Sequence, residues 1–132
     1  NRKIAEWDTN EVEDGLYAMR LMVIRENFQV DSHTIQVSVD NSLPSGKIIY
    51  PAADRTIPRS SQGSITLQAE ASDNTGIDRV EWWLDGKVVG NSTQMPYSYP
   101  ISINAGKHTV LIKIYDLAGN EVIVTEFEFI VE

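Results

Sequence analysis

Apolar residues alternate with polar ones along almost the whole chain, and this is the period of half-buried β-strands. Glu11 to Leu16 is the one stretch worth testing for helical period, and it is short and closed by Asp14-Gly15. Two strands are predicted near the N-terminus, with apolar faces formed by Tyr17, Met19, Leu21 and Val23 and by Ile35, Val37 and Val39. The turn-rich stretch 40–46 that follows is typical of a linker.

Seven further strands are predicted after this stretch, at 47–50, 64–71, 78–84, 87–90, 97–103, 108–115 and 121–131. Asp85-Gly86 is a strong hairpin signal between two of them. In the last strand Val122 and Val124 have one parity and Phe127 the other, so we expect a β-bulge near Thr125 that returns both sets to one face. The regular spacing predicts an all-β, seven-strand antiparallel sandwich over 44–132.

The two ends of the chain resemble each other, which indicates a repeated unit. The strand that begins at Gly15 aligns with the one that begins at Gly106, an offset of 91 positions (106 − 15), and Val39 aligns with Val131 at an offset of 92 (131 − 39). The later hairpin closes a seven-strand domain. We therefore expect residues 1–43 to be the last two strands of a preceding, incomplete sandwich, with Trp7 plugging its core. A lone hairpin is marginal, so dimerisation through 1–43 is a further expectation.

Composition excludes several classes of protein. The 132 residues carry a net charge of −8 with 11 scattered basic residues, which argues against nucleic acid and against an anionic membrane surface. There is no cysteine, so disulfides, thiolate catalysis and thiolate metal sites are excluded, and a bacterial origin is favoured. The chain starts at Asn1 instead of Met, and we expect it to be a piece of a longer protein.

Several motifs resemble those of known bacterial modules. Trp7-Asp8-Thr9, the run 14–21 and Val39-Asp40-Asn41 resemble the tail of a bacterial fibronectin- or immunoglobulin-like module. Residues that resemble the bacterial immunoglobulin-like domain are Pro51, Ala71-Ser72-Asp73-Asn74, Val80-Glu81-Trp82-Trp83-Leu84-Asp85-Gly86 and Asp116-Leu117-Ala118-Gly119-Asn120. Such tandems occur at the C-terminus of bifunctional penicillin-binding proteins (transglycosylase plus transpeptidase) and in other secreted bacterial proteins. The resemblance implies immunoglobulin-like sandwiches and an extracellular or cell-surface location. The chain departs from the family at the linker: the family tail usually runs Asp-Asn-Thr-Pro-Pro, whereas residues 40–44 are Asp-Asn-Ser-Leu-Pro, with one proline instead of two.

Candidate chemistry is sparse. The two histidines, His33 and His108, are each expected at the start of a strand in equivalent hairpins, where they cap strand edges and do not act as bases, and no serine lies in a nucleophile elbow. Carboxylates and amides gather at turns, and calcium takes six to eight such oxygens. Ordinary turn capping is the favoured interpretation of these residues. The alternative is a calcium site, for which the candidate ligands are Asp40, Asn41, Asp73 and Asp116.

An aromatic face is the other candidate site. Trp82 is in phase with Val80 and Leu84, which predicts a buried tryptophan, so Trp83 points outward. If the strand over 108–115 is its neighbour, Tyr115 and Lys113 join it on that outer face. The platform could stack on sugar rings of peptidoglycan or contact a cell-surface protein; the plainer reading is that a loop or a neighbouring module covers it.

The predicted function is that of a non-catalytic accessory module, because no catalytic constellation is present in the sequence. A spacer or scaffold in a secreted or surface-attached bacterial protein is the first hypothesis, with a penicillin-binding protein as the expected parent. A glycan- or protein-binding module that uses the face around Trp83 is the alternative. Neighbouring modules of the same polypeptide are the expected partners.

Overall fold

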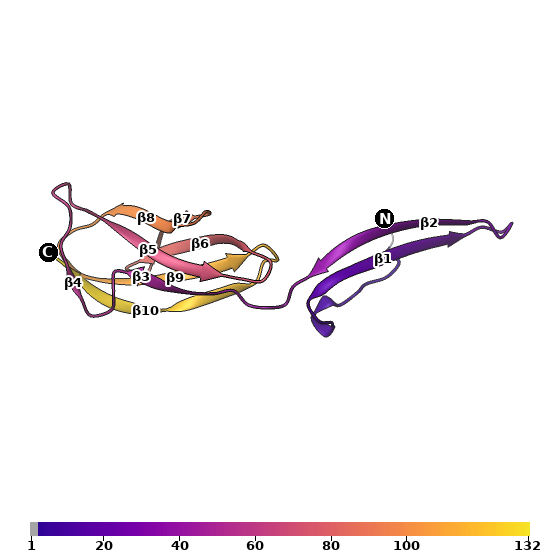
Figure 1. Cartoon of the computed structure of the whole chain (residues 1–132), viewed down its shortest axis with the longest axis horizontal. Helices are drawn as coiled ribbons and strands as arrows, with labels where there is room; N and C mark the ends of the chain where they lie inside the picture. The colour runs from indigo at the N-terminus through magenta and orange to yellow at the C-terminus, as the bar shows by residue number, and fades with distance from the viewer. Residues whose placement is uncertain (1–2) are drawn as a thin grey trace. The chain divides into compact units, whose positions relative to one another are not determined.

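The computed structural model describes residues 3–132, and the chain consists of two compact units, Asn1–Asn41 and Ser42–Glu132. The first unit contains a short 3-10 helix, η1 (Thr9–Glu11), whose N-cap Asp8 accepts a hydrogen bond from the amide of Asn10. Strands β1 (Gly15–Ile24) and β2 (Val30–Val39) then form an antiparallel hairpin (Figure 1). The segment tested for helical period, Glu11 to Leu16, is therefore not a helix: only Glu11 belongs to η1, and Gly15 and Leu16 already belong to β1.

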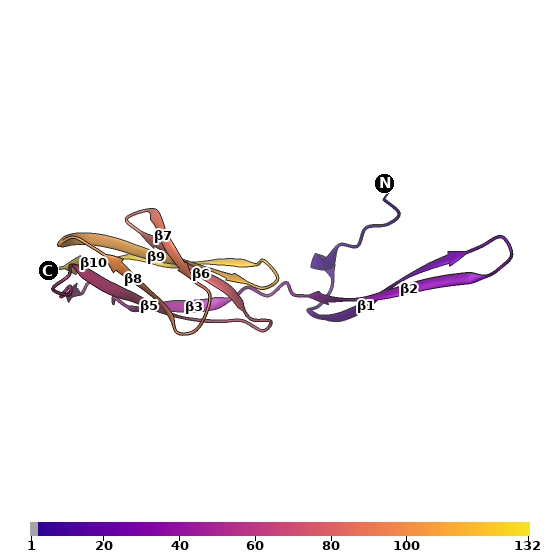
Figure 2. The same cartoon turned by 90° about the horizontal axis from the view of Figure 1, so that it is seen from above.

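The second unit consists of two sheets packed face to face (Figure 2). One sheet has three strands in the order β3-β5-β8, and the other has five in the order β4-β10-β9-β6-β7. Their bounds are β3 Ser45–Tyr50, β4 Thr56–Ile57, β5 Ser64–Ser72, β6 Ile77–Leu84, β7 Lys87–Ser92, β8 Tyr97–Ser102, β9 Gly106–Asp116 and β10 Glu121–Val131. The fold prediction is confirmed: an immunoglobulin-like antiparallel sandwich preceded by a two-strand hairpin. The two-residue strand β4, which pairs with β10 in parallel, was not predicted.

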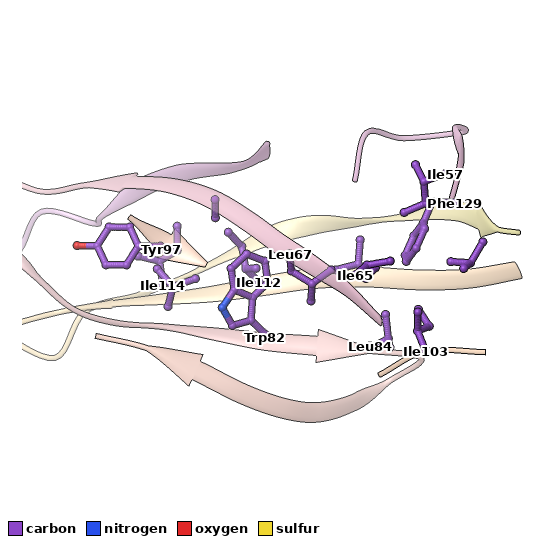
Figure 3. Close-up of a cluster of buried hydrophobic side chains, with 14 residues drawn as sticks. Ile57, Ile65, Leu67, Trp82, Leu84, Tyr97, Ile103, Ile112, Ile114 and Phe129 are labelled. Atoms are coloured by element: carbon purple, nitrogen blue, oxygen red, sulfur yellow. The ribbon is translucent and has the colours of Figure 1, made fainter. Parts of the chain in front are cut away.

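The core lies between these sheets, where alternate side chains of each inner face meet (Figure 3). Trp82 is buried at its centre, as predicted, and its indole nitrogen donates to the hydroxyl of Ser92 at 2.9 Å. That hydroxyl donates in turn to the carbonyl of Ser98 at 2.8 Å. Because Ser92 lies on β7 and Ser98 on β8, this buried relay joins one sheet to the other.

The predicted β-bulge is present in β10, where the register with β9 shifts between Val124 and Phe127. On one side of it Val122 and Val124 pack against the core, and on the other Phe129 and Val131 are buried in it. The bulge therefore keeps a strand of mixed parity on one core face.

The two hairpins of the chain share their register and their turn. Gly15 pairs with Val39 as Gly106 pairs with Val131, and Ile24 pairs with Val30 as Tyr115 pairs with Glu121. The bulge in β10 accounts for the single residue that separates the two sequence offsets.

The turns of these two hairpins are closed by the same pair of backbone bonds. In the first, the amide of Arg25 donates to Gln29 and that of Phe28 donates to Arg25. In the second, the amide of Asp116 donates to Asn120 and that of Gly119 donates to Asp116. Phe28 has φ 65° where the equivalent Gly119 has φ 97°, so the first turn keeps a left-handed backbone without glycine.

Candidate functional site

The predicted aromatic face lies on the outer side of the five-stranded sheet. β6 pairs antiparallel with β9, so that Glu81 lies opposite Lys113 and Arg79 opposite Tyr115. Trp83, two residues along β6, is half-buried, and its indole nitrogen donates to the carboxylate of Glu81 at 2.8 Å. The sheet pairing therefore brings the three predicted residues Trp83, Lys113 and Tyr115 together on one face.

Basic side chains lie over both rings of this face. The Lys113 ammonium is 4.8 Å from the centre of the Trp83 ring, and the Arg79 guanidinium is 3.8 Å from the centre of the Tyr115 ring. Cation–π contacts at exposed sites contribute about 0.5–1 kcal/mol each. A sugar that stacked on these faces would have to displace them, so the rings are already partnered within the sheet. Arg79 was not part of the sequence prediction.

Carboxylates complete the polar pattern of the aromatic face. Glu121 lies 3.7 Å from the Lys113 ammonium. Burial raises the pKa of the Tyr115 phenol, and a hydrogen bond to Glu121 and the negative charge of that residue add to the effect. The face therefore combines two aromatic rings, two cations and two carboxylates within a small area.

The four predicted metal ligands do not form one set in a single unit. Asp40 and Asn41 belong to the first unit, where Asn41 fastens the chain before β1 to the end of β2: its side-chain amide donates to the carbonyls of Thr9 and Val12. Asp73 and Asp116 belong to the second unit, with carboxylate oxygens within 4.8 Å of one another.

Asp73 and Asp116 both cap their own turns. The Asp116 carboxylate accepts the amides of Gly119 and Asn120 at 2.7 and 2.8 Å. Asp73 accepts the amides of Thr75 and Gly76; burial opposes its ionised form, yet these hydrogen bonds outweigh burial and lower its pKa. Both geometries are those of turn capping, and calcium binding stays a prediction.

His108 has a structural place that explains its position. Its Nδ1 is 2.8 Å from the Asp85 carboxylate and its Nε2 is 3.0 Å from the carbonyl oxygen of Asn104. Both partner atoms are oxygens that accept hydrogen bonds. Burial raises the pKa of Asp85, but the hydrogen bonds from His108 and the Thr109 amide outweigh it, and the pKa lies below its ordinary value. His108 thus ties the β6–β7 turn to the start of β9.

The expectation that each histidine lies at the start of a strand fits His108, close to the beginning of β9, and was wrong for His33. By hairpin register His108 corresponds to Tyr17, whereas His33 corresponds to Val124. His33 is exposed in the interior of β2 and not at its start. Trp7 is half-buried and contacts the Tyr17 ring edge-on, with ring centres 5.1 Å apart, so it covers the base of the first hairpin.

The ends of the second unit form a further feature that the sequence did not reveal. Its polypeptide enters at β3 and leaves from β10 at opposite ends of the sandwich (Figures 1 and 2). Gly46 lies against Ile114 of β9, whereas Val131 pairs with Gly106, eight residues (114 − 106) away on the same strand, or about 26 Å. Four backbone hydrogen bonds join β10 to the β4 region: Asp54 N to Glu128 O, Ile130 N to Arg55 O, Glu132 N to Ile57 O and Arg59 N to Glu132 O.

Comparison with known proteins agrees with this architecture. A family model described as a bacterial Ig domain matches residues 44–112. The uncharacterized protein YvnB of Bacillus subtilis (strain 168) is 31% identical over 124 residues, which are 92% of this chain and 8% of that protein. The fibronectin(III)-like modules of CbhA from Clostridium thermocellum superpose with a TM-score of 0.63 at 22% identity, covering 92% of this chain and 64% of that one. In residues 3–132, no helix is both long and apolar enough to cross a membrane.

Proposed function

Because this chain belongs to the bacterial Ig domain family, we propose that it is a non-catalytic spacer or scaffold module of a secreted or surface-attached bacterial protein. The matched family is a domain of the Ig type and no enzyme family is indicated. The chain spans 8% of the length of its Bacillus subtilis relative, which is consistent with one module within a long polypeptide. A cell-wall penicillin-binding protein remains the parent that the sequence resemblance predicts.

The observation that carries this proposal is the placement of the ends of the second unit. The polypeptide enters the second unit at β3 and leaves it from β10 at the opposite end, so a force that pulls on both ends of the unit acts along the strands. The hydrogen bonds between β4 and β10 lie across the strands, so such a pull loads them together and not one after another. A module of this geometry resists extension, which is what a spacer between an anchor and a distant domain requires.

Single-molecule force spectroscopy on the 132-residue chain, held at its ends, tests the spacer. We expect one cooperative event from the second unit, with a length gain of about 300 Å for residues 42–132 at ~3.3–3.6 Å each. The matched pair is Ile130→Pro, which removes the amide that donates to Arg55, and Ile130→Ala, which keeps it. We expect a lower unfolding force for the proline variant than for the alanine variant, with an equilibrium difference of only about 0.5–1.5 kcal/mol. Equal forces, or extension without a cooperative event, would contradict the spacer.

The aromatic face supports a second candidate, a glycan- or protein-binding module. Trp83 and Tyr115 are both partly exposed on one sheet face. The test is co-sedimentation with purified cell-wall sacculi, with Trp83→Ala beside Leu117→Ala as a control for another exposed apolar side chain. Binding lost only with Trp83 would favour the glycan-binding function, while no binding by any form directs the search to protein partners.

A further inference from the structure

The face of β1 in the first unit is exposed although its counterpart in the second unit forms the centre of a core. Met19, Leu21 and Val23 are 42%, 54% and 50% exposed. At the offset of 91 positions they correspond to Val110, Ile112 and Ile114, each of which is 0% exposed. Register and turn are shared by the two hairpins, so the difference lies in what covers them.

In the second unit the cover comes from the residues that precede the hairpin. Residues 42–105 form, among other strands, the three-stranded sheet β3-β5-β8, and Ile65, Leu67 and Tyr97 of that sheet join the core cluster with β9 and β10. In the first unit residues 1–14 precede β1, and of these Trp7 packs on Tyr17 at the base of the hairpin. The remainder of the face, from Met19 to Val23, is left to solvent.

We propose that this face is the docking surface for the polypeptide that precedes residue 1 in the longer protein, which supplies a three-stranded sheet in the place that β3-β5-β8 occupies in the second unit. Two observations favour this occupant. The matched chain of the fibronectin(III)-like modules extends beyond the region that this chain covers by 36% of its length (100 − 64). The net charge of −8 also disfavours a second copy of this chain, the dimer through 1–43 that the sequence led us to expect, because like charges repel. The inference goes beyond the spacer function and does not depend on it.

The test uses the absence of cysteine from the natural chain. Leu21→Cys and Met22→Cys place one thiol each on adjacent residues that are 54% and 52% exposed and point to opposite faces of β1. The labelling rate of each thiol with a maleimide is compared in the 132-residue chain and in a longer one that includes the residues encoded immediately upstream. We expect similar rates in the shorter chain. In the longer chain we expect at least a hundredfold slower labelling at position 21 than at position 22.

Hydrogen exchange on the unsubstituted longer chain provides a second readout, with slowed exchange of the amides of β1 and β2 as the expected result. Equal labelling at positions 21 and 22 in the longer chain, with unprotected amides, would overturn the proposal. Concentration-dependent protection of position 21 in the 132-residue chain would also overturn it, because a second copy would then be the occupant. Neither result would change the outcome of force spectroscopy on the second unit, so this inference and the spacer function can fail separately.

Discussion

The buried relay from Trp82 through Ser92 to Ser98 gives a quantitative prediction for the stability of the second unit. In Ser92→Ala the indole N–H of Trp82, which is fully buried, loses its acceptor. An orphaned buried donor costs about 1–3 kcal/mol, and the donor lost to the partly buried Ser98 carbonyl adds about 0.5 kcal/mol or more. We expect a total loss of about 2–3 kcal/mol. For a unit of this size that corresponds to a melting temperature lower by roughly 10–20 °C.

A double-mutant cycle in urea separates the relay from simple loss of packing. Trp82→Phe removes the indole N–H along with part of the ring, so Ser92→Ala in that background loses only the bond to Ser98. We expect that second cost to be about 0.5–1.5 kcal/mol, which leaves a coupling of about 1–2 kcal/mol. Equal costs of Ser92→Ala in both backgrounds would refute the relay as a unit.

Three further predictions concern turns. Phe28 has a left-handed backbone conformation, which costs a residue with a side chain about 1–2 kcal/mol and which glycine adopts without that cost. In Phe28→Gly we therefore expect hydrogen exchange of the β1 and β2 amides to slow several-fold. Unchanged exchange rates would contradict the strain at Phe28. Asp85 has a lowered pKa, so its contribution to stability is present above its ordinary value of 3.8 and is lost as pH falls through the folded value. Asp85→Asn should therefore flatten the pH dependence of urea unfolding below about pH 4, and an unaltered slope would refute that. Asp73 and Asp116 already accept hydrogen bonds from backbone amides, so we expect calcium to leave the melting temperature unchanged. The concentration to use is about 10 mM, which exceeds the dissociation constants of ~10⁻⁴–10⁻³ M that are typical of extracellular calcium sites. A rise in melting temperature that is lost in Asp116→Asn would instead establish a calcium site.

Much of the fold was predictable because its signals are local. Alternation gave the strands from 64–71 onward, and the parity conflict between Val124 and Phe127 predicted the bulge that the register shows. The inward direction of Trp82 followed from its phase with its neighbours. β4 was not predictable, because two residues cannot show a period and its pairing with β10 depends on a contact more than seventy positions away.

The candidate site was predictable only in part: Trp83, Lys113 and Tyr115 were predicted for this face, whereas Arg79 and the geometry were not. Phase placed Trp83 and Lys113 on one outer face. That a cation lies over each ring depends on side-chain rotamers and on the diagonal neighbours that the β6–β9 register brings together, and no sequence pattern encodes these. The position of His33 was misjudged for a similar reason: the sequence places it in a hairpin, but only the register shows that it lies in the interior of β2.

The shortness of β4 bears on how the second unit avoids pairing its sheet edges with the backbone of another strand. An unpaired strand edge invites the backbone of a neighbour to pair with it. The edge strand β4 of the five-stranded sheet is only two residues long, and Pro58 follows it directly. The edge strand β8 of the other sheet contains Pro100, which has no amide hydrogen to donate. At β4 and β8 the second unit therefore offers an incoming strand few backbone amides with which to pair.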